Sequence, residues 1–312
     1  MKYSSSFALI FILVMRLNAQ HANFNSQRNW SLHKKELQVG IGATQFNGDL
    51  GGAIGEGKDY SLKDIDMQAT APAFWVGYRQ RFHPLFATTT SFCVFQLKGD
   101  DKWSLEPSRY YRNINFRSLC FEVQQRVEFI FAANEKFGSI FNLPGNYSKK
   151  YRSQQYYIFG GVGLIHFNPK SEFEGKMYSL RLLKTEGQSK PYSPFSLTIP
   201  AGVGFRFGIS RIWRVGLELA YVKTFSDYID DVSTTYANPS LFNSPEALHF
   251  SNPKEPSTPW GSAYSAGKKR GDPNQKDAYY HINLIFTRNL TYKDYGKERS
   301  KYNLKSSGRY KV

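Results

Sequence analysis

The chain has 312 residues, 16% of them aromatic, and its 41 Lys and Arg outnumber its 25 Asp and Glu to give a formal net charge of +16. This length is enough for one large β-domain. Only one stretch is apolar enough to cross a bilayer as a helix, which excludes a helical membrane bundle. The high aromatic content argues against general disorder, and two Cys cannot supply a disulfide framework.

Residues 1–19 have the organisation of a secretory signal peptide. Lys2 supplies the positive start, residues 7–15 form an unbroken apolar run, and Leu17-Asn18-Ala19 is a plausible cleavage site. A membrane anchor is the less favoured alternative, because the run is short for a helix that spans a bilayer. An exported protein does not meet the nucleoid, so we expect no nucleic-acid partner. The basic charge must then face lipid head groups, polysaccharide or protein, and residues 20–35 are expected to form a periplasmic N-terminal segment.

Eight segments of the remaining chain alternate apolar and polar residues with the period of a β-strand. The clearest covers residues 117–129, where Leu119 and Phe121 alternate with Cys120 and Glu122. The others cover residues 37–44, 74–79, 85–97, 155–167, 195–207, 213–221 and 280–287.

In each segment the alternation gives one apolar and one polar row of side chains, on opposite faces of the strand. The composition of the two rows indicates which one faces lipid. The polar rows consist mainly of Gly, Ser, Thr and charges of both signs, and the apolar rows carry aromatic residues near the strand ends, which is typical of a transmembrane barrel. An even number of strands closes such a sheet without an unpaired edge. We therefore predict an all-β, eight-stranded antiparallel transmembrane outer-membrane β-barrel over residues 36–290. The alternative is an exported soluble sandwich or lipocalin-like barrel.

The connections alternate in length, as in outer-membrane barrels, where short turns are periplasmic and long loops are outside. Tight turns are predicted at residues 83–84 and 208–210, and long polar connections at 47–69, 99–113, 168–194 and 226–276. The connection 132–152 breaks the rule, because it is long but should be periplasmic. It is either a functional periplasmic element or a sign that the strand count is wrong there.

Eight strands leave an interior that side chains can fill. Because a lone buried charge is costly, opposite charges in this lumen should pair. We expect a structural salt-bridge plug rather than a conduction path or a catalytic carboxylate pair. The inward candidates are Arg79, Glu122, Arg126, Glu128, Arg206, Arg214 and Glu218.

Catalytic and metal motifs give little signal. The six His have no metal-ligand spacing and there is no G-x-S-x-G motif, so no catalytic, cofactor or metal site is expected. A Ca²⁺ site among the three carboxylates of residues 227–231 is conceivable, but a polar junction between strand and loop is favoured. Cys93 and Cys120 would lie opposite each other if their hairpin were symmetric about residues 106–107, and free thiols are favoured over a bridge.

Residues 291–312 form a basic tail with seven Lys and Arg against two acidic residues, a net charge of +5. The tail follows the last strand and should lie in the periplasm, where it stays disordered or orders on an acidic partner. The candidate partner contacts are Lys293, Lys297, Arg299, Lys301, Lys305 and Arg309.

Five stretches resemble a known family. They are GVGLIHFNP at 161–169, TEGQ at 185–188, IPAGVG at 199–204, DYIDDVS at 227–233, and Arg270-Gly271 followed by Asp277. They are similar to motifs of the PorG-like outer-membrane barrels of Bacteroidetes, a group associated with the type IX secretion system. The similarity covers roughly residues 155–290 and extends to the opening stretch GIGATQFNGDLGG.

The resemblance implies an integral outer-membrane protein, without catalysis or cofactor, that docks to a periplasmic lipoprotein ring and anchors the secretion and gliding machinery. Two alternatives stay open. One is a passive structural or surface-binding barrel that acts through the 226–276 loop, and the less favoured one is a lipid-modifying outer-membrane enzyme. The loop's aromatic residues are Tyr236, Phe242, Phe250, Trp260 and Tyr264.

Overall fold

The computed structural model describes residues 30–31, 33–50, 67–104, 106–136, 152–210 and 212–291. The expected signal peptide, residues 137–151 and the basic tail after residue 291 lie outside the described residues. Among the described residues, no helix is long and apolar enough to cross a bilayer.

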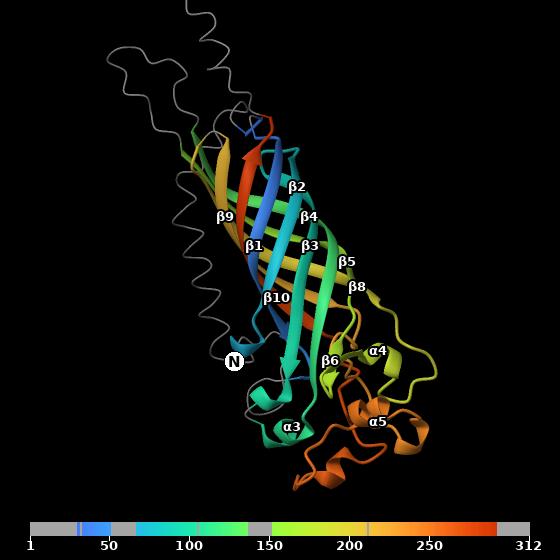
Figure 1. The fold of residues 1–312 in the computed structure, drawn as a ribbon. Helices are drawn as coiled ribbons and strands as arrows, with labels where there is room; N and C mark the ends of the chain where they lie inside the picture. Colours follow the sequence, from blue (N-terminus) through green and yellow to red (C-terminus); the bar gives the residue numbers. More distant parts are fainter. Residues whose placement is uncertain are drawn as a thin grey trace, which may run out of the picture.

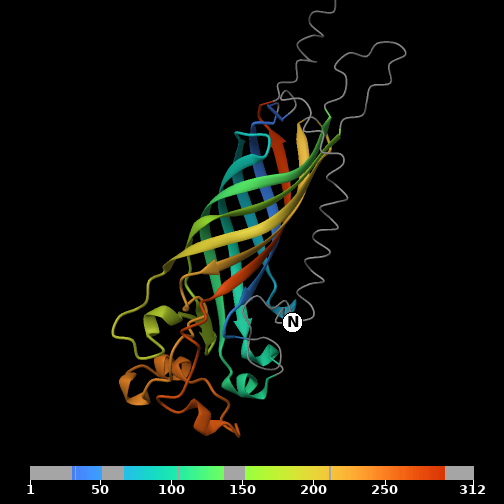
Figure 2. The same cartoon turned by 180° about the vertical axis from the view of Figure 1, so that it is seen from behind.

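Eight antiparallel strands close into a barrel (Figures 1 and 2). Each strand pairs with its neighbour along the barrel wall, and the first strand pairs with the last over twelve residue pairs, from Glu36–Asn289 to Asn47–Ala278. The predicted eight-stranded antiparallel barrel is therefore confirmed. Its strands are β1 (Lys35–Asn47), β2 (Ala71–Arg81), β3 (Phe86–Asp100), β4 (Asn115–Lys136), β5 (Arg152–His166), β8 (Phe195–Gly208), β9 (Trp213–Thr224) and β10 (Ala278–Asn289).

The remaining elements gather at one end of the barrel, which we call the loop end; the opposite end, with the short β2–β3 and β8–β9 connections, is the turn end (Figure 1). The hairpin of β6 and β7 lies in a segment that the sequence predicted only as a loop, because strands of four residues are too short to show a period. The elements are η2 (Met67–Ala69), η3 (Asp101–Trp103), α3 (Pro107–Arg112), β6 (Lys170–Phe173), β7 (Lys176–Ser179), α4 (Leu180–Leu183), η4 (Pro239–Leu241), α5 (Pro245–Ser251) and η5 (Gly261–Tyr264).

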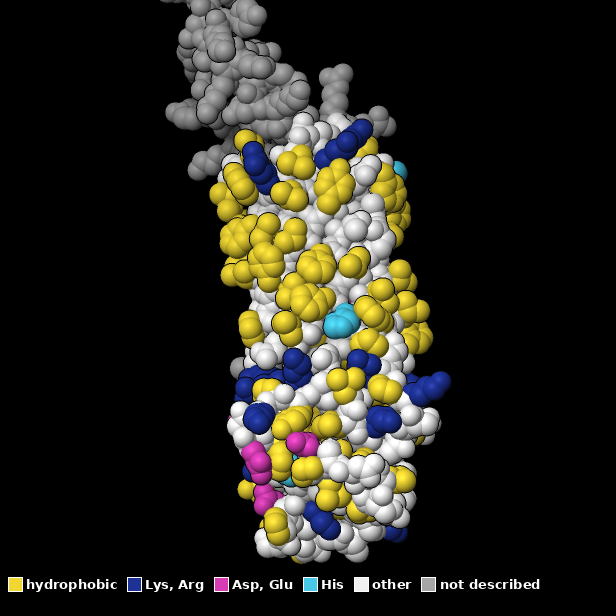
Figure 3. All heavy atoms as spheres, turned by 45° about the vertical axis from the view of Figure 1, so that its right-hand side comes forward, with side chains coloured by type: hydrophobic (Ala, Val, Ile, Leu, Met, Phe, Trp, Pro, Cys, Tyr) yellow, Lys and Arg dark blue, Asp and Glu magenta, His cyan; other side chains and the backbone are white. Residues whose placement is uncertain are grey.

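The apolar rows of the strands face outward. On β4, the Leu119 side chain is 54% exposed while its neighbour Cys120 is fully buried, and on β8 Val203 is 51% exposed while Arg206 is buried. Apolar side chains cover much of the wall on the face that Figure 3 shows. We call this surface the lipid belt; it includes Leu37, Ile41, Phe74, Phe92, Leu119, Phe121, Val123, Val127, Val162, Leu164, Leu197, Val203, Leu217, Leu219, Ile282 and Phe286.

The lipid belt decides between the two barrel types. Soluble monomers rarely expose a continuous apolar patch larger than a few hundred Å². A lipocalin-like barrel would turn these rows inward, and here they are turned outward. The chain is thus a transmembrane β-barrel of the outer-membrane kind.

The lumen differs from the prediction in its loop-end half. There the inward rows carry Trp75, Phe95, Leu97, Phe116 and Tyr279, all buried, instead of Gly and charges. They form one apolar cluster with loop residues such as Ile229, Val232 and Phe250. The ion-paired charges of the lumen lie in the turn-end half.

Two inward glycines make room for aromatic rings in this lumen. A Cβ at Gly77 would lie 2.6 Å from the ring of Trp75, and a Cβ at Gly204 would overlap the ring of Tyr157. These two glycines therefore leave space for large neighbouring rings in a tightly filled lumen.

The β3–β4 register corrects the predicted position of the cysteines. Cys93 lies opposite Glu122, and Cys120 lies opposite Phe95. The centre of the hairpin is one residue later than assumed, so the two cysteines are two positions out of register. Both are buried free thiols.

The β4–β5 hairpin also differs from the prediction, because part of the 132–152 connection is strand. The two strands pair as far as Lys136 and Arg152, with a bulge between Ile130 and Ala132. Pairing of β4 with β3 ends earlier, at Phe129. The hairpin therefore extends past β3 at the turn end, and only residues 137–151 are left outside the described strands.

Candidate functional site

A buried ion-pair network fills the turn-end half of the lumen. Arg79 on β2 connects two carboxylates: its Nε lies 2.7 Å from Glu128 Oε2 on β4, and its Nη1 lies 2.8 Å from Glu36 Oε2 on β1. Thr89 Oγ1 donates a hydrogen bond of 2.6 Å to the other oxygen of Glu128. Arg214 Nη1 lies 3.0 Å from Glu36 Oε1.

A second part of the network centres on Glu218 of β9. Arg126 Nη1 lies 3.0 Å from Glu218 Oε2, and the Tyr157 hydroxyl donates to Glu218 Oε1. Arg206 lies between the two parts, within 3.7–3.8 Å of Glu36, Glu128 and Glu218. Aromatic rings complete the cluster, since the Arg126 guanidinium is 4.4 Å from the centre of the Phe159 ring.

Six of the seven predicted lumen residues belong to this network, and Glu122 does not. Glu122 points inward, but it accepts hydrogen bonds from Gln124 (2.7 Å) and Thr198 (2.6 Å). None of the described Lys or Arg lies within ion-pair distance of it. Glu36 was missed because it stands at the predicted start of the barrel; extending the alternation of Gln38 and Gly40 backward by one step would have found it.

The network seals the lumen. Arg79, Arg126, Arg206 and Tyr157 are among the largest fully buried side chains of the described chain. A side chain without water-accessible surface has no water-filled channel beside it. The barrel therefore has the predicted salt-bridge plug, and the arrangement does not suit a diffusion porin.

Replacing Glu128 with Gln should destabilise the barrel by about 3–5 kcal/mol, because Arg79 and Arg206 would lose a carboxylate in a site without water. Urea unfolding in lipid vesicles measures this change. Glu172→Gln, at an exposed position on β6, should change the free energy of unfolding by no more than about 0.5 kcal/mol. A loss below about 1 kcal/mol in Glu128→Gln would contradict a stabilising plug.

At the loop end, three of the stretches that resemble the family meet in one buried cluster, which we call the cap cluster. Glu186 accepts hydrogen bonds from the backbone N–H groups of Ser233 (2.9 Å) and Thr234 (3.1 Å), and Arg270 Nη1 lies 3.1 Å from its Oε1. Asp231 accepts from the hydroxyls of Thr185 and Tyr192. The Arg270 guanidinium thus joins residues that lie about 40 to 85 positions before it in the sequence.

Arg112 joins the cap to further loops. Its Nε and Nη2 each lie 2.7 Å from the carboxylate of Asp101, and it donates to the backbone carbonyls of Asp49 and Arg270, both at 2.8 Å. Burial lowers the pKa of Arg112, but the Asp101 carboxylate outweighs burial and raises it above its ordinary value. The guanidinium therefore stays charged and holds the β1–β2, β3–β4 and β9–β10 connections together.

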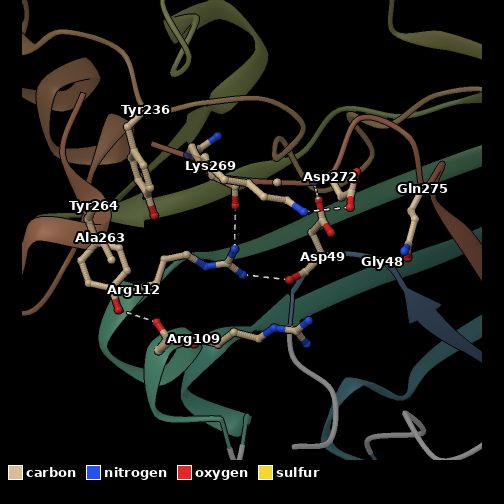
Figure 4. A pocket seen from close by; sticks show the side chains of 13 residues that line it. Gly48, Asp49, Arg109, Arg112, Tyr236, Ala263, Tyr264, Lys269, Asp272 and Gln275 are labelled. Atoms are coloured by element: carbon tan, nitrogen blue, oxygen red, sulfur yellow. Dashed lines mark hydrogen bonds and ion pairs between the residues drawn. The ribbon is translucent and has the colours of Figure 1, made fainter. Parts of the chain in front are cut away.

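A cavity of about 330 Å³ opens beside Arg112 (Figure 4). Lys269 Nζ and Asp272 Oδ2 form an ion pair of 2.8 Å at its wall. Charges of both signs and tyrosines line it, which suits a small polar ligand. The lining side chains include Asp49, Arg109, Arg112, Tyr236, Tyr264, Lys269, Asp272 and Gln275.

The aromatic residues of the 226–276 loop serve mostly as packing. Tyr236, Phe250 and Tyr264 are 3%, 6% and 4% exposed, whereas Trp260 is 44% exposed. They build the interior of the cap, so the predicted aromatic binding surface is reduced to its exposed members.

The carboxylates of residues 227–231 do not converge on one point. Asp231 turns to Arg270, Asp227 accepts from the Ser233 hydroxyl at 2.6 Å, and Asp230 accepts from the Val232 N–H at 3.0 Å. Among the described residues, no group of three or more His, Cys, Asp or Glu is placed to hold a metal ion. The carboxylates instead accept hydrogen bonds from side chains and backbone of the loops.

Burial raises the pKa values of several of these carboxyls. It raises the pKa of Asp227 to about 7 and of Asp231 to about 6. Burial, together with the carboxylates beside them, also raises the pKa values of Asp230 and Asp277 well above the usual range. The charged groups facing Asp227, Asp230 and Asp277 are Asp49, Glu186, Lys223 and Lys276.

The cap should therefore weaken as pH rises. Between about pH 4, the pKa of an unfolded Asp, and the raised folded values, the folded cap binds protons that the open cap releases, so stability falls with rising pH. Asp230→Asn removes one such carboxyl. At pH 8 it should slow loop proteolysis by about tenfold for each unit by which folding raises the pKa of Asp230, and at pH 5 by much less.

Asp272→Asn is the matched control, because the hydrogen bond from Lys269 lowers the pKa of Asp272. It should give no protection at pH 8. Equal protection by both variants, or none by Asp230→Asn, would show that ionisation of the buried carboxyls does not weaken the cap.

No family model matches the chain, and no curated protein matches it. Among solved structures, it is similar to neisserial surface protein A, with 7% identity, a TM-score of 0.36, and coverage of 82% of this chain and 97% of the other. It is also similar to Ail of Yersinia pestis, with 12% identity, a TM-score of 0.31, and coverage of 82% of this chain and 97% of the other. For OprG of Pseudomonas aeruginosa the identity is 9%, the TM-score is 0.34, and the coverage is 82% of this chain and 96% of the other. The assignment as a transmembrane β-barrel rests on the strand pairing and lipid belt of the chain itself.

Proposed function

We propose that this chain is a non-enzymatic, integral outer-membrane barrel of a Gram-negative bacterium, exported by a cleaved signal peptide, that anchors the type IX secretion and gliding machinery through periplasmic contacts. The sealed lumen carries the proposal. Because Arg79, Arg206 and Glu128 close the interior, the work of the protein falls to its outer surfaces.

The resemblance to the PorG-like barrels gives the direction of this work. Its stretches at 185–188 and 227–233, together with Arg270, are in contact in the cap cluster. If the family has a loop cap in common, its motif stretches should contact one another there. The contacts seen in this chain therefore support the resemblance.

The turn end offers a contact surface for a periplasmic lipoprotein ring. Residues 132–136 of β4 pair with β5, but pairing with β3 has already ended at Phe129. Among the described strands, this leaves one edge of the hairpin without a strand partner. Such an edge can add a strand from another protein, and the basic tail after Thr291 can add charge contacts with an acidic partner.

Two deletions test the periplasmic contact without cutting the barrel. Lys136 and Arg152 lie opposite each other, so a two-residue Asn-Gly turn can replace residues 137–151. A second variant ends after Thr291, which is the last described residue and accepts a hydrogen bond from the Lys35 N–H. We expect secretion to fall in at least one variant while heat-modifiable migration shows an intact barrel.

Normal secretion in a strain that carries both deletions would contradict the periplasmic contact. Normal secretion in a strain that lacks the whole gene would contradict the secretion role itself.

The cavity at the loop end favours a second candidate, a barrel that binds a small polar surface ligand. Arg109 and Lys269 offer donors and Asp49 and Asp272 offer acceptors at one cavity. Loss of surface adhesion with normal secretion after Arg109→Ala would favour this candidate over the anchor.

A further inference from the structure

Three basic side chains lie next to one another on the outer surface, at the loop-end border of the lipid belt. Lys98 on β3 lies opposite Arg117 on β4, and Arg117 lies opposite Lys170 on β6. On β4, Arg117 belongs to the outward row that continues with Leu119 and Phe121. We call Lys98, Arg117 and Lys170 the basic triad; Figure 3 shows Lys and Arg side chains gathered between the lipid belt and the loops.

No direct ion pair within the described residues compensates the charge of the triad. Like charges directly opposite each other destabilise a sheet. Among the described residues, no Asp or Glu lies within ion-pair distance of the triad; Lys98 Nζ instead lies 5.5 Å from the centre of the Trp103 ring.

The nearest carboxylates lie on the far side of the triad from the belt. Asp100 is opposite Asn115, one outward position closer to the loops than Arg117, and it accepts a hydrogen bond from the Lys102 N–H. Glu172 follows Lys170 along β6 in the same direction. The side of the triad that faces the membrane therefore carries only positive charge.

The position of the triad identifies the group that can compensate it. Side chains at the edge of the lipid belt stand in the headgroup layer, where the anions are lipid phosphates. Neighbouring strands are about 4.8 Å apart, so three basic residues on three adjacent strands extend over roughly 10 Å. One phosphate is too small to contact all of them, whereas two phosphates on one headgroup can.

We propose that the basic triad binds a glycolipid of the outer leaflet that carries two phosphate groups, with its acyl chains lying on the lipid belt. The phosphates accept charge-assisted hydrogen bonds from Lys98, Arg117 and Lys170. The acyl chains follow the outward rows of β3, β4 and β5, which include Phe92, Leu119, Phe121 and Leu164. This inference needs the barrel to sit in a membrane, but it does not need a part in secretion.

The test uses the full mature chain in detergent micelles, with native mass spectrometry to measure bound lipid. The probes are lipid A with two phosphates, the same lipid A after dephosphorylation, and phosphatidylglycerol. We expect the bisphosphorylated lipid to bind most tightly. Lys98→Gln, Arg117→Gln and Lys170→Gln together should weaken its binding by about five-fold per charge removed.

The matched control removes three lysines that are exposed at the loop end away from the lipid belt, by Lys176→Gln, Lys190→Gln and Lys268→Gln. It loses the same charge and should bind lipid A as the native chain does. Heat-modifiable migration checks that each variant is folded, and the comparison of probes on the native chain needs no variant.

Three results would overturn the proposal. They are equal binding of dephosphorylated lipid A, equal binding of phosphatidylglycerol, and equal losses in the triad and control variants, which would show attraction by overall charge alone.

Discussion

Hydrocarbon offers no water to a charge or to a backbone N–H, and this constraint organises the structure. The backbone satisfies it by closing β1 onto β10, so that the sheet has no edge within the membrane. The side chains satisfy it by turning Leu, Val and Phe outward and charges inward. Glu36, Glu128 and Glu218 then lie beside Arg79, Arg126, Arg206 and Arg214, where the partner charge replaces lost solvation.

The plug and the cap divide the barrel along its axis. The turn-end half of the lumen is charged, whereas the loop-end half is apolar and continuous with the packed loops. Beyond this half, among the loops themselves, Arg112 and Arg270 connect loops through hydrogen bonds to carboxylates and carbonyls. Because the interior is closed by side chains from both halves, interactions with other molecules take place at the loop end, the turn end and the lipid-facing wall.

The strands and their buried faces could be predicted from the sequence, because they follow the two-residue alternation. Contacts that depend on how the loops pack could not. The alternation of Leu119 with Cys120 and Glu122 predicted which side of β4 is buried, and the tight turns fixed the order of strands. The register of Cys93 depended on the shape of a loop that contains α3, which periodicity does not report. Glu186, Asp231 and Arg270 were visible as motif residues, but their contact results from the folding of two long connections over each other. The basic triad was hidden for a similar reason, because β6 is too short to be predicted.

The apolar rows of the strands face hydrocarbon, and spin labels on these rows report whether lipid or water surrounds them. Labels at Leu119, Val203 and Leu217 in a Cys93→Ala, Cys120→Ala background can be compared with a label at the exposed loop residue Trp260. In lipid vesicles, oxygen concentrates in hydrocarbon and should relax the three wall labels strongly, whereas a water-soluble nickel complex should relax them weakly. Wall labels that the nickel complex reaches as readily as the label at residue 260 would show that the apolar rows do not face hydrocarbon.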